Sequence, residues 1–322
     1  DTDTTGDIYT TAPGAKTNLG YRADSPRDTI QSILEQYRLV GGDSIRVDTG
    51  SYTLTNQVFI SPKASGSGTN QVLILGSTNL AAGGTLVQAG INMRAPAFEF
   101  YGAHDVRLAN IRIKGFTNGV SVAEQSSRCV LESLDIQESF GSGVVLNKSQ
   151  DITLRRVSIR HGTASAISLA QGKAMIESCV LWSNAASAVS LGSGADLGIT
   201  NSVVSAFGLA SYCYESPTNI TIQANYNAYF LTNGAQMASI DGVQYESLPQ
   251  WVRAKAPIDR YSLHTDPLFA DAATGDFHLK SSAGRYQLGV GWVQDPPVNG
   301  QPVFSPLIDM GAPTTGWTSE PA

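Results

Sequence analysis

A strand-like pattern that recurs about every 23 residues restricts the fold of this chain more than any other feature of the sequence. Six aligned segments begin at positions 105, 128, 151, 173, 196 and 219, so successive starts lie 22 or 23 residues apart. In each segment the second and fourth residues are apolar, as Ile152 and Leu154 are in the segment DITLRRVSI. Alternation with a period of two indicates a half-buried β-strand. The chain therefore carries an internal repeat whose first element is a short strand.

Two more short strands complete most repeats. A second apolar pair follows the first strand, as Val157 and Ile159 do, and a third strand follows a Gly/Ala-rich turn, as in GVVL from Gly143. A repeat of this length has no room for the crossover helix of a βαβ sheet. The pattern predicts an all-β fold, a right-handed parallel β-helix solenoid whose coils stack at about 4.8 Å. Equivalent positions of successive coils then form columns of touching side chains.

The non-repetitive ends predict two covers for the solenoid. We expect one structural domain, in which residues 1–41 form an N-terminal segment with a cap helix, residues 42–230 form the coils, and residues 231–322 form an irregular C-terminal cap and an extended tail. The cap helix is expected to begin at Ser25 and Pro26. A second short helix is expected to begin at Ser247 and to end before Pro257. After Gly284 the chain is rich in Pro, Gly and Thr and has no periodicity, which predicts the tail.

Composition excludes several classes of protein. The net charge is −6 and the chain has no run of Lys or Arg, which argues against a nucleic-acid partner. No apolar stretch approaches the roughly 20 residues that span a bilayer. The three cysteines, Cys129, Cys179 and Cys213, stand far apart in apolar contexts, so we expect buried core residues and no zinc site.

The remaining metal candidates are weak. The opening stretch DTDTTGD has carboxylates but lacks the ligand spacing of a calcium loop, so a frayed terminus is expected. His264 and His278 fall in the C-terminal cap, where a structural role is expected. We therefore predict no metal and no cofactor.

Both ends of the chain carry motifs that resemble a known family. The front segments are DTIQSILEQY and GGDSIRVDTGSYTL, and the rear segments are DPLFADAATGDFHLKSSAGRY from Asp266 and SPLIDMGAP from Ser305. These resemble the right-handed β-helix (pectin-lyase-like) modules of large secreted and surface proteins of bacteria. The resemblance implies the fold, an extracellular or cell-surface location, and other domains of the same polypeptide as neighbours. It implies no activity, because such modules occur both in polysaccharide-cleaving enzymes and in proteins with no known reaction.

Two columns at the end of the first strand are predicted to be structural. The fifth position of the strand places Arg155 between Glu132 and Glu177, which predicts a ladder of surface ion pairs worth roughly 0–1 kcal/mol each. The sixth position holds Asn or Ser in four of five coils, as expected for a turn, and Arg156 is the exception.

The column at the end of the second strand is the candidate site. Its outward side chains are Lys114, Gln137, Arg160 and Trp182, and Glu138 and His161 follow directly in the chain. Polysaccharide β-elimination needs a base and a cation, which Lys114, His161 and Arg160 could supply together with Glu138. Trp182 and Gln137 are candidates for glycan contact, since an indole face stacks on a sugar ring.

Two functions stay open at this point. The favoured one is a non-catalytic β-helix module for structure, adhesion or contact with a polysaccharide or cell-surface glycan. The alternative is a polysaccharide lyase or glycoside hydrolase that acts on an extracellular glycan. The Asp-His and Arg-x-Pro-x-x-Arg signatures of pectate lyases are absent, as are the clustered aspartate pairs of polygalacturonases.

Overall fold

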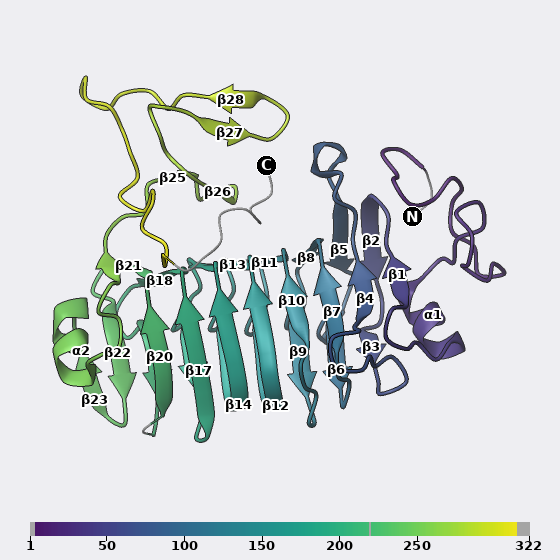
Figure 1. Cartoon of the computed structure of the whole chain (residues 1–322), viewed down its shortest axis with the longest axis horizontal. Helices are drawn as coiled ribbons and strands as arrows, with labels where there is room; N and C mark the ends of the chain where they lie inside the picture. Colours follow the sequence, from purple (N-terminus) through teal and green to yellow (C-terminus); the bar gives the residue numbers. More distant parts are fainter. Residues whose placement is uncertain (1–3, 219, 314–322) are drawn as a thin grey trace.

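The computed structural model describes residues 4–218 and 220–313, and it is a parallel β-helix with an added C-terminal segment (Figure 1). Successive coils stack along the long axis of the molecule, and the strands of the coils pair in parallel with the equivalent strands of the next coil, whereas the last strand of the 15-stranded sheet pairs antiparallel with its neighbour. The predicted solenoid is confirmed. The first three residues of DTDTTGD, the first residue of the sixth repeat and the end of the expected tail lie outside the described residues.

The strands form two large parallel stacks. The 15-stranded sheet contains β1 (Ser44–Arg46), β3 (Val58–Ile60), β4 (Val72–Leu75), β6 (Phe98–Tyr101), β7 (Val106–Ala109), β9 (Val120–Ala123), β10 (Val130–Glu132), β12 (Val144–Arg155), β14 (Ile167–Glu177), β16 (Val189–Leu191), β17 (Ala195–Thr200), β19 (Tyr212–Ser216), β20 (Thr221–Asn225), β22 (Gln236–Ile240) and β23 (Val243–Tyr245). The nine-stranded sheet, here called the second sheet, contains β2 (Gly50–Leu54), β5 (Thr85–Ala89), β8 (Ile111–Lys114), β11 (Asp135–Gln137), β13 (Ser158–Arg160), β15 (Val180–Trp182), β18 (Val203–Phe207), β21 (Ala228–Thr232) and β24 (Leu263–His264).

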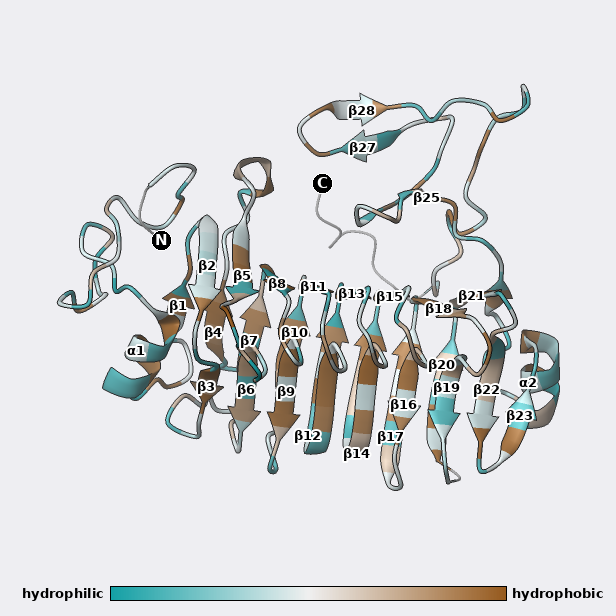
Figure 2. Cartoon of the chain, turned by 180° about the vertical axis from the view of Figure 1, so that it is seen from behind, coloured by the Kyte–Doolittle hydropathy of each residue, from teal (hydrophilic) through white to brown (hydrophobic). Residues whose placement is uncertain are grey.

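The core lies inside the coils because one side chain in two points inward. Ile152 and Leu154 are fully buried, as the alternation predicts, and the same holds for the equivalent residues of neighbouring coils. Figure 2 shows the hydrophobic residues recurring across the stacked strands. All three cysteines are free and buried, which confirms their expected place in the core.

Tight turns with a left-handed backbone connect the strands. The column that follows the first strand has positive φ in Asn110, Ser133, Arg156, Ser178 and Asn201. The column that follows the second strand has positive φ in Gly115, Glu138, His161 and Ser183. Glycine, Asn and Asp adopt this conformation most readily. Its recurrence shows that successive coils turn at the same two positions.

The helix of the N-terminal cover begins later in the chain than the sequence predicts. Helix α1 (Ile30–Gln36) begins after Thr29, whose side chain accepts a hydrogen bond from Ser32 N, and not at Ser25. Residues 8–10, which follow DTDTTGD, are held on the solenoid because the buried Asp48 carboxylate accepts their three backbone N–H groups at 2.6–2.8 Å. These hydrogen bonds hold the pKa of Asp48 below its usual range despite burial. A short 3-10 helix, η1 (Leu80–Ala82), lies in the connection between β4 and β5.

The C-terminal cover contains the expected helix. Helix α2 (Leu248–Lys255) follows Ser247 with proline in its first turn, as predicted. Beneath it the buried carboxylate of Asp259 accepts hydrogen bonds from Tyr229 Oη at 2.8 Å and from Trp251 Nε1 at 3.0 Å. Tyr229 also hydrogen-bonds Tyr214, so aromatic residues at this end seal the core.

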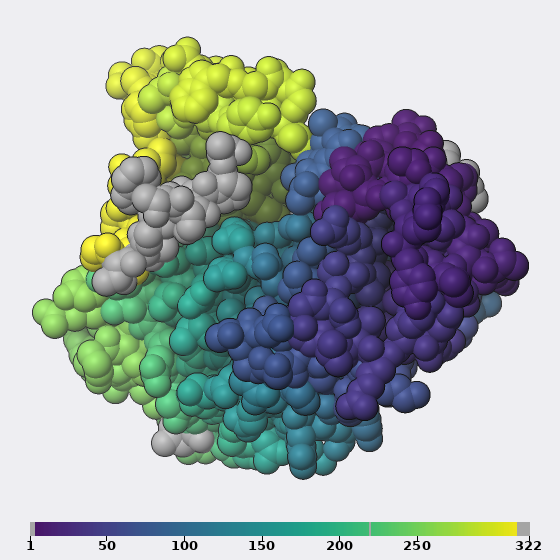
Figure 3. Space-filling model, turned by 45° about the vertical axis from the view of Figure 1, so that its right-hand side comes forward, coloured from purple at the N-terminus to yellow at the C-terminus, as the bar shows by residue number. Residues whose placement is uncertain are grey.

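The last part of the chain is more ordered than the predicted tail. Antiparallel strands β25 (Phe269–Asp271) and β26 (Asp276–Leu279) form one hairpin, and β27 (Arg285–Gln287) and β28 (Gly291–Val293) form a second. Figure 1 shows that both hairpins project from the solenoid on the side where the second sheet lies, and in Figure 3 the C-terminal residues, in yellow, rise above the coils. The absence of periodicity after Gly284 therefore did not mean an absence of strands, because a two-stranded hairpin needs too few residues to show a period.

Candidate functional site

The outward column of the second sheet has the register that the repeat predicts. Lys114 pairs with Gln137, Gln137 with Arg160, and Arg160 with Trp182 on successive strands β8, β11, β13 and β15. Neighbouring members are therefore one strand spacing apart, about 4.8 Å. The six predicted site residues do lie on one face, but the structure divides them into an open group and a covered group.

The open group lies at the N-terminal half of the column. Lys114 Nζ lies 3.0 Å from Glu138 Oε1 on the next coil, and both side chains are about half exposed. Glu138 and His161 occupy the left-handed turn column, in which the preceding coil has Gly115. We call Lys114, Gln137, Glu138 and His161 the polar floor.

The surroundings of His161 affect its protonation. Partial burial and the adjacent Arg160 cation lower the pKa of His161, and the carboxylates of Glu138 and Asp135 oppose this only in part. The lowered pKa favours the neutral imidazole. A neutral imidazole can accept a hydrogen bond or a proton.

The covered group consists of Arg160 and Trp182. Arg160 is only 8% exposed, and its Nε and Nη2 atoms each lie 3.4 Å from a carboxylate oxygen of Asp135. The β25–β26 turn lies directly on it, because a Cβ atom at Gly275 would be 2.7 Å from the Arg160 guanidinium carbon. Arg160 thus supports the C-terminal hairpin and does not face the solvent.

Trp182 packs against aromatic residues of the solenoid and of the same hairpin. Its ring stacks on Phe230 with a centroid distance of 5.4 Å, and it meets Phe207, Phe269 and Phe277 edge-on. Phe269 and Phe277 belong to β25 and β26, so the hairpin is held by an aromatic cluster. One face of Trp182 is therefore already used for packing within the chain, and its role in glycan contact stays a prediction.

The sequence pattern did not identify an exposed aromatic residue that lies beside the polar floor. Phe140 lies two residues after Glu138, and it is 68% exposed. The equivalent positions of the adjacent coils hold Thr117 and Thr163. A phenylalanine in a turn column that holds threonine on the coils before and after it was the sequence signal that could have identified Phe140.

The predicted charge ladder is instead a cluster around one buried carboxylate. Glu132 is 1% exposed, and its Oε1 lies 2.9 Å from Arg155 Nε. Arg107 and Arg156 also form ion pairs with Glu132. These guanidinium groups hold the pKa of Glu132 below its usual range against the effect of burial. Arg155 is thus structural, as expected. Its ion pair is not a surface pair, because Glu132 is buried, and Arg156 pairs with the same carboxylate.

Other surfaces offer less chemistry. The outward column of the third strands pairs in register on successive coils and has only small side chains, Ser121, Val145, Ser168 and Ser190. Within residues 4–218 and 220–313, no group of three or more His, Cys, Asp or Glu side chains could hold a metal ion. No described helix is long and apolar enough to cross a membrane.

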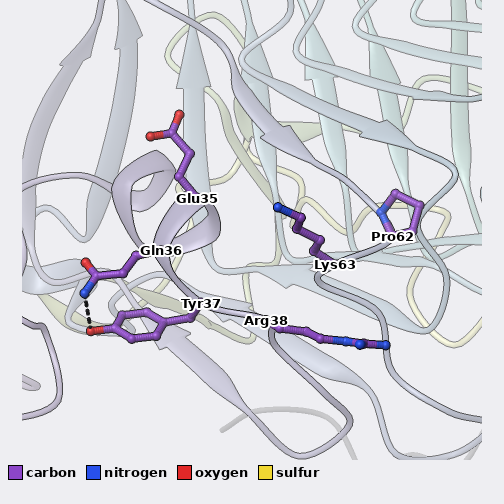
Figure 4. Close-up of a pocket in the computed structure, with 6 residues that line it drawn as sticks. All are labelled: Glu35, Gln36, Tyr37, Arg38, Pro62 and Lys63. Carbon is purple, nitrogen blue, oxygen red and sulfur yellow. Dashed lines mark hydrogen bonds between the residues drawn. The ribbon is translucent and has the colours of Figure 1, made fainter.

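Two hollows lie at the N-terminal end, away from the polar floor. One of about 450 Å³ lies beside α1, and its lining residues are Glu35, Gln36, Tyr37, Arg38, Pro62 and Lys63 (Figure 4). Another of about 690 Å³ lies between the N-terminal segment, α1 and β1. Gln36 donates to the Tyr37 hydroxyl at 2.9 Å in the first, and Asp48 lines the second with the residues it anchors. Neither hollow includes a polar-floor residue.

A match to a protein family supports the fold. None of the curated protein sequences compared with the chain matches it. Among solved structures, the crystal structure of pectate lyase Pel9A is similar with a TM-score of 0.47 and 14% identity, covering 90% of this chain and 92% of that one. The ORF18 protein of Geobacillus virus E2 is similar with a TM-score of 0.37 and 12% identity, covering 66% of this chain and 52% of that one. Residues 96–228 match the family described as "Right handed beta helix region", so the solenoid is a right-handed parallel β-helix.

Proposed function

We propose that this chain is a non-catalytic β-helix module that binds a polysaccharide on the polar floor. The module would serve an extracellular or cell-surface protein, with other domains of the same polypeptide as neighbours. The observation that carries the proposal is the row of solvent-accessible Lys114, Gln137, Glu138 and His161 on consecutive coils, with Phe140 beside it. A row of hydrogen-bonding groups with an adjacent aromatic ring suits an extended chain of sugar units.

The ion pairs of the site favour binding over elimination. A base that takes a proton must be free to approach the substrate, whereas Lys114 Nζ is paired with the Glu138 carboxylate at 3.0 Å. A cation that stabilises a developing anion must reach the substrate, whereas Arg160 is buried beside Asp135 under the hairpin. Two of the groups that a lyase would require are thus engaged within the chain.

The backbone at the polar floor supports a role for its side chains. Glu138 and His161 have φ of 55° in a turn column in which Gly115 stands on the coil before Glu138. Residues with a side chain pay a conformational cost there that glycine does not pay. A chain that needed only the turn would be served by glycine at both positions.

A second candidate function is polysaccharide lyase activity with His161 as the base. The lowered pKa of His161 favours it, since a neutral imidazole is present at neutral pH. This function predicts that polygalacturonate develops the absorbance of an unsaturated uronate, and that the activity is lost in His161→Gly. Binding without new absorbance or new reducing ends supports the non-catalytic proposal.

The binding test uses glycine substitutions, because they remove the side chain and relieve the turn. The wild-type protein is run in native gels that contain polygalacturonate, galactomannan or β-glucan. We expect at least one of these polysaccharides to slow its migration. Glu138→Gly combined with His161→Gly should abolish that retardation and leave the melting temperature unchanged or higher. Ser183→Gly, at the equivalent turn position of the next coil with φ of 51°, is the matched control and should bind normally. Equal retardation of all three proteins would refute the proposal.

A further inference from the structure

Beyond the polar floor, the β27–β28 hairpin carries a pair of exposed aromatic residues. Tyr286 and Trp292 are directly opposite each other in the antiparallel register, and they are 52% and 70% exposed. Side chains opposite each other in such a pair point to the same face and lie about 4.5–5.5 Å apart at Cβ. The two rings thus form one surface on the outer face of the hairpin.

The orientation of Trp292 is fixed by a glycine. A Cβ atom at Gly284 would lie 2.1 Å from Trp292 Nε1 and 2.3 Å from Cε2, so the indole rests against the bare backbone of Gly284. Gly284 has φ of +123°, a conformation that favours glycine. One side of the indole is therefore supported, while most of the side chain still faces the solvent.

The base of the hairpin is tied by an ion-pair network. Arg285 Nε lies 3.0 Å from Asp295 Oδ2, and the same carboxylate oxygen accepts Ser281 N at 2.8 Å. Arg285 Nη1 also lies 3.5 Å from Asp276 on β26. This network joins the second hairpin to the first, which packs on Arg160 and Trp182. The aromatic surface is thus held in place on the side of the solenoid where the polar floor lies (Figure 1).

The exposed face of the hairpin is uncharged. Its outward residues in the described hairpin are Tyr286, Leu288, Val290 and Trp292. The nearby cation, Arg285, is only 14% exposed at its side chain and is paired with two carboxylates. Such a face suits an uncharged sugar ring whose flat side is lined by C–H groups, as in β-linked glucose units with equatorial hydroxyls.

We propose that Tyr286 and Trp292 form a stacking platform for uncharged β-linked hexose units of the glycan that the polar floor binds. This inference rests on the proposed function and names the substrate class. The platform and the floor lie on the same side of the molecule, so one glycan chain would use both. The tyrosine hydroxyl and the indole N–H add polar edges that a purely aliphatic protein-docking face would lack.

The test is a titration of the full chain with cellohexaose, in which binding is measured by tryptophan fluorescence and by isothermal titration calorimetry. We expect saturable binding with a blue shift that Trp292→Phe removes, and an affinity at least tenfold weaker in the double variant Tyr286→Ala, Trp292→Ala. Tyr261→Ala controls for loss of exposed aromatic area elsewhere, and this variant should bind normally because the Tyr261 ring, which is 53% exposed, stacks on Tyr226 away from both surfaces.

The possible failures point to different conclusions. Binding that depends on Glu138 and His161 but is unchanged in the hairpin variant would overturn the platform and leave the proposed function standing. Binding of polygalacturonate but not of cellohexaose would overturn the uncharged substrate class. Sedimentation that shows a dimer of the wild type, lost in the hairpin variant, would assign the aromatic face to a second copy of the chain. Absence of any glycan binding would overturn both proposals.

Discussion

The Nε atom of Arg155 lies 2.9 Å from Oε1 of Glu132 on the preceding coil, and Glu132 is buried beneath three guanidinium groups. A buried carboxylate destabilises the folded state unless cationic side chains pair with it. We therefore expect Glu132→Gln to reduce the free energy of unfolding by about 1–3 kcal/mol, because three crowded but partly exposed guanidinium groups would lose their counter-charge. Urea unfolding measures the change. Glu177→Gln, on the other side of Arg155 in the register, should cost much less.

The same carboxylate predicts how stability depends on pH. The pKa of Glu132 is lowered by its arginine partners in the folded state, so its contribution is present above the unfolded pKa of about 4.3. That contribution is lost as the pH falls through the folded pKa. The difference in unfolding free energy between the wild type and Glu132→Gln should therefore be constant near neutral pH and shrink below about pH 4. A difference that grows in acid would contradict the assignment.

Asp48 predicts the order of the N-terminal segment. Its carboxylate accepts the backbone N–H groups of residues 8–10 and of Thr49. An amide in its place offers one acceptor oxygen, so Asp48→Asn should cost about 1–3 kcal/mol and release the segment. Trypsin should then cleave after Arg22 or Arg27 many times faster in the native protein. Asp24→Asn, which removes only an exposed ion pair with Arg22, should leave the cleavage rate near that of the wild type.

Gly275 predicts how tightly the first C-terminal hairpin is docked. Its φ is +91°, and an added Cβ would meet the Arg160 guanidinium. Gly275→Ala should therefore displace the hairpin, weaken the near-ultraviolet circular dichroism of Trp182 and cost about 1–3 kcal/mol beyond the backbone effect. Gly289→Ala separates backbone strain from the clash with Arg160. Gly289 also has a positive φ, +76°, but an added Cβ would meet nothing within 4 Å. Equal costs in both variants would show that Arg160 is not packed under the hairpin.

The repeat made the column positions predictable, because parallel coils of nearly equal length fix which residues are neighbours. Lys114, Gln137, Arg160 and Trp182 were placed in one column from spacing alone, and the strand register confirms it. The same logic placed Arg155 beside Glu132. It missed Arg107 as a third partner, because Arg107 occupies a different position of its strand and reaches Glu132 only through its long side chain.

The covering of Arg160 and Trp182 was not predictable from the repeat. It depends on an aperiodic segment more than 80 residues later that folds back across the second sheet, and no spacing rule links the two. The sequence did place Phe269 and Phe277 in the C-terminal cap, but it gave no indication of the surface on which they would pack. Exposure is likewise a tertiary property, which is why Phe140 and the Tyr286–Trp292 pair emerged only from the structure.

Hydrogen–deuterium exchange of the full chain with and without cellohexaose or polygalacturonate tests the central claim most directly. A glycan on the polar floor should slow exchange in peptides that cover residues 114–118, 137–142 and 160–163, and with cellohexaose also in residues 284–293. Exchange in the outer face of the third strands, near Ser121 and Ser168, should not change. Protection confined to the N-terminal hollows near residues 35–38 and 62–63, or no protection by either glycan, would contradict the account.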